Sequence, residues 1–281
     1  MKPELLITTN GYKDTWSAIE YGVWLADAMQ LKVRLLGVAE SLRPAVIDDH
    51  HPLEDVFAKA IDLFEQKGIE YNPEIQNGDS EQVIPQKANS GDFITVVSPL
   101  GRPLIRRWLT GRSIRPLMEK IKVPILYVPE ARLPLKKMLI SIGGLGYEVA
   151  AENLAFEVAV ASQADVTILH VITPTDVAYP GTRDMREHLN DLEDTNTLVG
   201  RSLRTALDIA QKAGLNAKAT TRQGNVVDEI LAEIRRGSYD MVCMGSPYSA
   251  TGLRQLYTPN VTAEIAEAAH CPVLTARYKR E

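Results

Sequence analysis

The chain is poor in cysteine and has no long apolar run. Cys243 and Cys271 lie in apolar stretches without CxxC spacing, so we expect two buried, reduced thiols rather than a disulfide or a redox pair. No segment reaches the roughly 18 apolar residues of a membrane span. The first residues, MKPELLITTNG, are too short and polar for a signal peptide. We therefore expect a cytoplasmic protein with no membrane partner.

An excess of positive charge is also absent. The net charge of -5 and the pI near 5.7 disfavour a general nucleic-acid binder, which needs a basic surface to neutralise phosphates. No Ser-His-Asp order, HExxH motif or paired carboxylates indicate catalysis. His50 and His51 lie among four acids in residues 47–55, but adjacent side chains diverge, so we expect a hydrated loop and no metal.

The sequence instead contains an internal repeat. Residues 4–11 (ELLITTNG) resemble 137–144 (KMLISIGG), and 31–40 resemble 164–173, both at a shift of 133 positions. Later, 92–99 resemble 240–247 at a shift of 148, which indicates an insertion of about 15 residues in the second half.

Each half alternates short β-branched runs with amphipathic segments, which is typical of a doubly wound parallel sheet. We expect an α/β fold of two tandem Rossmann-like domains with five strands each, 1–130 and 136–281, joined by the proline-containing linker 129–135. The segment 184–213 predicts an enlarged second helix in the second half. The predicted strands are 4–9, 32–38, 69–75, 93–97 and 124–128, then 137–142, 165–171, 216–222, 240–244 and 272–276.

Open parallel sheets bind ligands at the carboxyl ends of their strands, where helix N-termini point amides at anions. The candidate residues at these ends are Thr9, Asn10, Val38 and Ser98 in the first half, and Gly143, Val171, Gly245 and Ser246 in the second.

The two similar halves, the small-residue turn after each first strand and the closing HCPVLTA resemble a tandem universal stress protein over essentially the whole chain. The resemblance implies a pseudo-dimer joined through the last strands, 125–128 and 273–276. Members that bind ATP carry an Asp after the first strand and a G-x2-G-x9-G-[ST] loop around the phosphates. Here Asn10 replaces the Asp, and Ser98, Gly101, Gly111 and Arg112 occupy the loop positions, followed by Ser113.

The second half departs further from this motif. Gly143 stands in place of the Asp, and only Gly245 survives, because Tyr248, Pro259 and Asn260 occupy the remaining positions. The double glycine at 143 and 144 therefore indicates a tight turn that lines a pocket but does not bind phosphate alone.

The first half is the better candidate for an anion site. Five arginines (Arg102, Arg106, Arg107, Arg112 and Arg115) and no acid lie between residues 101 and 115. Arginine binds phosphate bidentately, so Arg112 could replace the hydroxyl donor of the motif. The alternative is a solvated arm whose arginines pair with acids or cover a partner surface.

Three functions follow as hypotheses. The first is a non-enzymatic stress-response protein that binds ATP, another adenine nucleotide or a smaller anion in the first half, with Mg only if ATP binds. The second is a scaffold that binds no nucleotide and works through protein-protein contacts with unknown partners. A homodimer is compatible with each hypothesis. The third is a weak ATPase, for which the sequence offers no general base or metal-binding carboxylate.

Overall fold

The computed structural model describes residues 2–40, 52–100, 114–143, 149–173, 191–246 and 261–277. The chain divides into two compact units, Met1–Ala131 (unit 1) and Arg132–Glu281 (unit 2). Within the described ranges, none of the helices combines the length and the apolar composition that crossing a bilayer requires.

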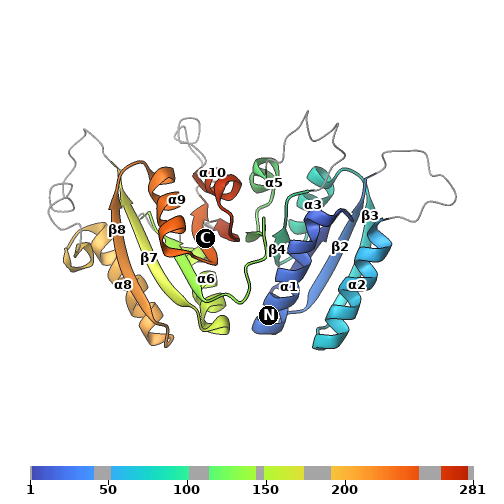
Figure 1. Cartoon of the computed structure of the whole chain (residues 1–281), viewed down its shortest axis with the longest axis horizontal. Coiled ribbons are helices and arrows are strands. Elements are labelled where there is room, and N and C mark those ends of the chain that lie inside the picture. The colour runs from blue at the N-terminus through green and yellow to red at the C-terminus, as the bar shows by residue number, and fades with distance from the viewer. Residues whose placement is uncertain are drawn as a thin grey trace. The chain divides into compact units, whose positions relative to one another are not determined.

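In its described residues, unit 1 contains five parallel strands in the order β3-β2-β1-β4-β5, with helices on both faces (Figure 1). The apolar, β-branched composition of the central strands suits their burial on both faces. The elements are β1 (Glu4–Thr9), η1 (Lys13–Thr15), α1 (Trp16–Met29), β2 (Val33–Ala39), α2 (Pro52–Lys67), β3 (Tyr71–Asn77), α3 (Ser80–Ala88), β4 (Phe93–Val97), α5 (Arg115–Lys120) and β5 (Ile125–Tyr127).

Two close approaches show which helices cover which face of this sheet. A Cβ built on Gly22 of α1 would lie 2.5 Å from Ile7 of β1, and one on Gly37 of β2 would lie 2.7 Å from Phe57 of α2. Because side chains alternate along a strand, the odd positions of β1 and β2 face α1 and α2. Even positions such as Arg34 project from the opposite face, which carries α3.

Unit 2 repeats the arrangement, and its described strands follow the order β10-β9-β6-β7-β8, all parallel. Helices α3 and α9 start alike, because Asp79 and Asn225 accept hydrogen bonds from the first-turn amides. The elements are β6 (Lys137–Ser141), α6 (Val149–Ser162), β7 (Asp165–Ile172), η2 (Leu192–Asp194), α8 (Leu198–Lys212), β8 (Ala217–Gln223), α9 (Val226–Gly237), β9 (Met241–Ser246), α10 (Val261–Ala268) and β10 (Val273–Arg277).

The predicted α/β fold with parallel strands is confirmed, and each predicted strand matches an observed one to within about two residues. Both cysteines are free and buried, as predicted. The single long helix predicted over 184–213 is wrong within the described part of that segment. There η2 precedes α8, which starts after Thr197, whose hydroxyl accepts from the amide of the third helical residue at 3.0 Å. The Thr195 hydroxyl instead donates to the carbonyl of Leu192 at 2.7 Å, and threonines that bond the local backbone favour caps over helix interiors.

Candidate functional site

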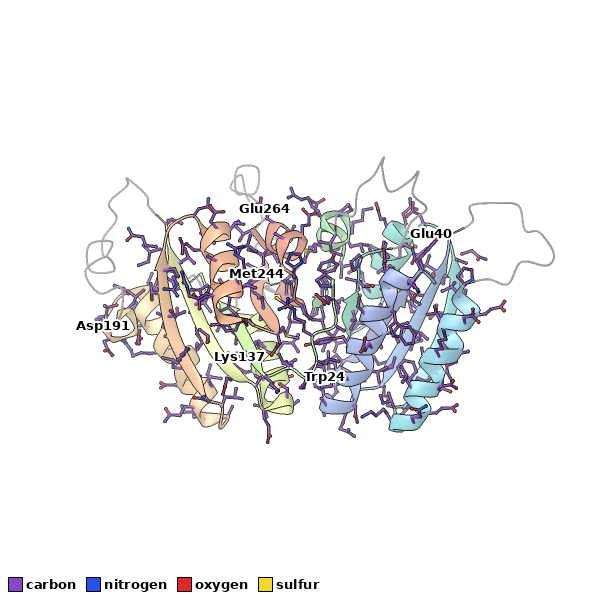
Figure 2. All side chains as sticks on the ribbon, in the orientation of Figure 1. Trp24, Glu40, Lys137, Asp191, Met244 and Glu264 are labelled. Carbon is purple, nitrogen blue, oxygen red and sulfur yellow. The ribbon has the colours of Figure 1, made fainter. Side chains whose placement is uncertain are left out.

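The carboxyl ends of β1, β2 and β4 meet at one edge of the unit 1 sheet. Thr9 pairs with Gly37 of β2, and Ile7 pairs with Val96 of β4, so the chain brings Thr9, Val38 and Ser98 to the same edge. Glu40, just after β2, lies at this edge as well (Figure 2). The predicted ligand residues on these three strands therefore occupy neighbouring positions.

The hydroxyl of Thr9 is engaged within the protein. Thr15 donates its single hydroxyl proton to the carbonyl of Tyr12 at 2.6 Å. In the 2.6 Å contact between the two threonine hydroxyls, Thr9 must therefore be the donor and Thr15 the acceptor. The Thr9 oxygen also accepts a hydrogen bond from the amide of Gly11 at 3.1 Å. Thr9 thus shapes the turn after β1, and its proton is already used inside the fold.

The first turn of α2 closes over the turn that follows β1. Gly11 has φ +84°, and a Cβ there would lie 2.9 Å from the backbone nitrogen of Leu53. Asn10, which stands where ATP-binding relatives carry an Asp, is only 3% exposed. This part of the predicted site is therefore packed against the fold.

Ser98 differs from Thr9 because its hydroxyl is uncommitted. The residue is 1% exposed, and among the described residues its Oγ has no hydrogen-bond partner. A buried hydroxyl without a partner is uncommon, since native structures satisfy most buried polar atoms. Ser98 stands at the carboxyl end of β4, three residues before the arginine-rich segment begins.

The remaining loop residues predicted in unit 1, Gly101, Gly111, Arg112 and Ser113, lie outside the described residues, as do His50 and His51. In the part of the chain that the structure does describe, no group of three or more His, Cys, Asp or Glu side chains is placed to hold a metal.

The matching edge of unit 2 offers few side-chain donors among its described residues. Gly143 is exposed just beyond β6, Val171 is buried in β7, and the Gly245 carbonyl accepts from Thr262 at 3.2 Å. The backbone of Ser246 ends β9, paired with Arg277. His170 donates from Nδ1 to the carbonyl of Ile142 at 3.0 Å, which ties β7 to the end of β6.

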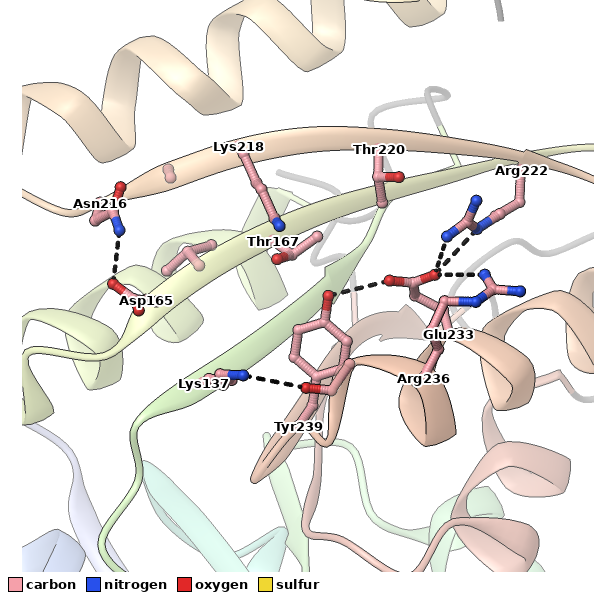
Figure 3. A pocket seen from close by; sticks show the side chains of 13 residues that line it. Lys137, Asp165, Thr167, Asn216, Lys218, Thr220, Arg222, Glu233, Arg236 and Tyr239 are labelled. Carbon is pink, nitrogen blue, oxygen red and sulfur yellow. Dashed lines mark hydrogen bonds and ion pairs between the residues drawn. The ribbon is translucent and has the colours of Figure 1, made fainter. Parts of the chain in front are cut away.

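Unit 2 also contains a cluster of hydrogen-bonded charged side chains on the face that carries α9, which was not predicted from the sequence. Glu233 of α9 is 6% exposed and accepts from Arg222 of β8 at 2.6 and 3.0 Å, from Arg236 at 3.2 Å and from the Tyr239 hydroxyl at 3.2 Å (Figure 3). Burial alone would raise the pKa of Glu233, but the hydrogen bonds and charge of Arg222 leave it below its ordinary value. Burial also raises the pKa of Tyr239. Glu233 is therefore ionised at neutral pH and holds the Arg222 guanidinium in place.

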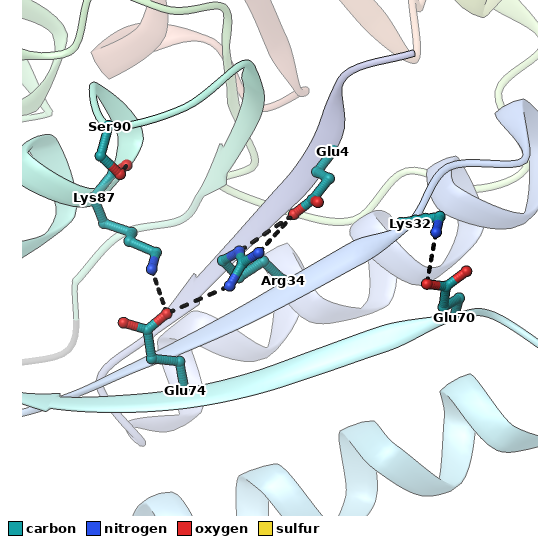
Figure 4. Close-up of polar contacts among 7 residues, drawn as sticks. All are labelled: Glu4, Lys32, Arg34, Glu70, Glu74, Lys87 and Ser90. Carbon is teal, nitrogen blue, oxygen red and sulfur yellow. Dashed lines mark hydrogen bonds and ion pairs between the residues drawn. The ribbon is translucent and has the colours of Figure 1, made fainter. Parts of the chain in front are cut away.

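Unit 1 carries charges at the equivalent face, with a different arrangement. Arg34 of β2 donates to Glu4 at 3.1 and 3.2 Å, lies 3.8 Å from Glu74, and has its guanidinium 5.9 Å from the centre of the Phe93 ring (Figure 4). Lys87 of α3 also bonds Glu74, and hydrogen bonds from Lys87 and Gln76 lower the pKa of that carboxyl. Two acids thus balance two bases in one closed network.

These clusters were missed because each residue is an ordinary surface type in sequence. Lys87 lies seven residues after the start of α3, and Glu233 lies seven after the start of α9, so equivalent positions carry opposite charges. A position-by-position comparison of the repeats would have shown this reversal.

Comparison with known proteins agrees with the architecture. The model of the family described as Universal stress protein family matches residues 134–277, slightly more than half of the chain. The chain is 27% identical over 147 residues, 50% of its length and 98% of the relative's, to Universal stress protein YxiE of Bacillus subtilis.

Two solved structures are among the matches, and the first of them supports the fold. A universal stress protein from Archaeoglobus fulgidus has 16% identity and a TM-score of 0.64, over 98% of this chain and 96% of that one. A universal stress protein solved in complex with cAMP has 18% identity and a TM-score of 0.39, over 52% of this chain and 98% of its own. The family model over unit 2 gives the conclusion: the chain belongs to the universal stress protein family.

Proposed function

We propose that this chain is a non-enzymatic stress-response protein whose unit 1 binds an adenine nucleotide or a smaller phosphate-containing ligand. The site would lie at the carboxyl ends of β1, β2 and β4, the edge at which open α/β sheets bind ligands. Thr9 and Asn10 would form its floor, because both are buried there. In this proposal the corresponding edge of unit 2 is degenerate, since Gly143 has no side chain with which to contact a base or a ribose.

The observation that carries the proposal is the buried Ser98 hydroxyl. Leaving such a group without a partner costs about 1–3 kcal/mol, which a bound oxygen acceptor would recover. Ser98 also aligns with the first glycine of the phosphate loop in nucleotide-binding relatives, and the five arginines between 101 and 115 follow it in sequence. A phosphate would accept from Ser98 while guanidinium groups neutralise its charge.

A scaffold that binds protein instead of nucleotide is the second candidate. It is favoured by the closure of α2 over Gly11 and by the internal use of the Thr9 proton, which together reduce the donors available to a ligand. Weak ATP hydrolysis is the third hypothesis, and Mg-dependent phosphate release would test it.

The test is calorimetric titration of the nucleotide-stripped full chain with ATP, with and without Mg, together with mass spectrometry of any co-purified small molecule. We expect about one ATP per chain, and a loss of roughly tenfold in affinity for Ser98→Ala, equal to about 1.4 kcal/mol. Arg112→Ala should weaken binding further, because it removes a charged donor.

Thr95→Val is the matched control for Ser98→Ala. Thr95 lies in β4 itself, is fully buried and, among described residues, has a hydroxyl that also lacks a partner. Thr95 lies three residues from Ser98, within the strand rather than at its end. Removing its hydroxyl should therefore leave the ATP affinity unchanged. No binding and no co-purified ligand would refute the nucleotide proposal and favour the scaffold.

A further inference from the structure

Unit 2 contains a polar cavity that lies away from the strand edge discussed above. Its volume is about 430 Å³, within the range of roughly 300–1,000 Å³ typical of small-molecule sites. It lies beside the starts of β6 and β7, along β8 and against the last turn of α9 (Figure 3). The charged residues that line it are Lys137, Asp165, Lys218, Arg222, Glu233 and Arg236.

The charges around this cavity are unequal, because four cations face two carboxylates. One carboxylate, Asp165, accepts from Asn216 at 2.8 Å. The other, Glu233, is shared between Arg222 and Arg236, so one carboxylate serves two guanidinium groups. The protein therefore leaves an excess of about two positive charges at the wall of the cavity.

Strand β8 supplies a row of donors. Side chains two residues apart share a strand face, so Lys218, Thr220 and Arg222 all line the cavity. Figure 3 shows the Lys218 ammonium extending from β8 toward Thr167, and none of the described residues accepts a hydrogen bond from it. Arg222 bonds Glu233 through Nε and one Nη, which leaves its other Nη with no bond to a described residue.

Unit 1 carries a different set of side chains in the equivalent region. By register, Arg34 is the counterpart of Thr167, since they pair with Asn72 and Lys218 at the same level of β3 and β8. Arg34 occupies the space in unit 1 and joins a network of two acids and two bases. In unit 2 the shorter Thr167, whose side chain hydrogen-bonds the Tyr239 hydroxyl, lines the cavity instead. Lys137 and Thr220 replace the two acids Glu4 and Glu74.

The geometry points to an anion-binding site in this cavity, suited to a small organic phosphate. A phosphate monoester carries close to two negative charges at neutral pH, which matches the excess positive charge. Its oxygens can accept from the Lys218 ammonium, the Thr220 hydroxyl and the Arg222 guanidinium together. This site is separate from the proposed nucleotide edge of unit 1, which contributes none of its residues.

Glucose 6-phosphate is the probe, titrated calorimetrically into the full chain, with glucose and inorganic phosphate as the comparison ligands. We expect glucose 6-phosphate to bind and glucose not to bind. Binding of inorganic phosphate as well would support recognition through the anion. Absence of binding by both glucose 6-phosphate and inorganic phosphate would overturn the proposal.

Lys218→Gln should weaken the binding of glucose 6-phosphate by at least about tenfold, because it removes an uncommitted charged donor. Lys212→Gln is the matched control, since it makes the same charge change at an exposed lysine at the end of α8. It should change the affinity by less than about twofold. Equal losses in the two variants would show a nonspecific charge effect and overturn the proposal.

Thr167→Arg separates a cavity from a merely positive surface. It installs the residue that unit 1 carries, so it adds a positive charge and fills the space. We expect it to abolish binding, whereas tighter binding would refute the site. Circular dichroism would confirm that the variant is folded, and the Lys218→Gln result stands alone if it is not. Binding of glucose 6-phosphate that Ser98→Ala weakens and Lys218→Gln does not would belong to unit 1 and would overturn the proposal.

Discussion

Replacing Glu233 by Gln should destabilise unit 2 without changing the size of the side chain. The carboxylate accepts hydrogen bonds from Arg222, Arg236 and Tyr239, and a neutral amide oxygen accepts them about half as strongly. The substitution therefore leaves the fold intact and removes a charge from the centre of the network.

The expected loss follows from how exposed each partner is. Arg222 is 32% exposed and makes two hydrogen bonds to Glu233, so weakening them should lower the free energy of unfolding by about 1 kcal/mol. Arg236 is 60% exposed and one helical turn away, which limits its share to about 0.3 kcal/mol. The buried Tyr239 hydroxyl adds about 0.5–1 kcal/mol. The total is about 2 kcal/mol, or a urea midpoint lower by about 1 M if the slope is near 2 kcal/mol/M.

Urea unfolding followed by two signals would localise the effect. Trp16, Trp24 and Trp108 are the only tryptophans of the chain and all belong to unit 1, so their fluorescence reports that unit. Far-ultraviolet circular dichroism reports both units, and its unit 2 component should shift. Asp208→Asn, an exposed carboxylate on α8, is the matched control and should change stability by less than about 0.5 kcal/mol.

The pH dependence gives a second check. Because the pKa of Glu233 is lowered by folding, its contribution is complete above the unfolded-chain pKa near 4.5 and is lost as pH falls through the folded-state value. The stability difference between the wild-type protein and Glu233→Gln should therefore be largest at pH 7 and shrink below about pH 4.5. A difference under about 0.5 kcal/mol at pH 7 would refute the assigned role of the network.

Three further predictions concern packing. Cys243 and Cys271 should not react with a thiol reagent at pH 8 until the protein unfolds, because burial raises the pKa of both thiols, that of Cys271 to about 11. Rapid labelling of the native protein would contradict their burial. Gly11→Ala should cost at least about 1 kcal/mol in urea unfolding, because its positive φ and the nearby α2 backbone exclude a Cβ. Thr197→Ala should lower stability by about 1 kcal/mol through loss of the α8 cap, and a neutral result would show that the cap is dispensable.

The sequence predicted the strands well because their apolar runs are short, β-branched and repeated at a fixed shift. It failed at 184–213, where charged and apolar spacing suggested one helix while Thr195 and Thr197 bond the backbone and start α8 late. At the candidate site, sequence could place Thr9 and Ser98 at strand ends but could not tell them apart. Only the contacts show that the Thr9 proton is used and that the Ser98 hydroxyl has no partner among the described residues.

The reversal of charge between α3 and α9 also bears on how two similar repeats in one chain fold correctly. If the helices exchanged places, Glu233 would meet the acid Glu74 and Lys87 would meet the base Arg222. Like charges in partly buried positions are penalised, whereas each helix on its own sheet forms an ion pair. The reversal therefore favours each helix on the sheet of its own half over the exchanged arrangement.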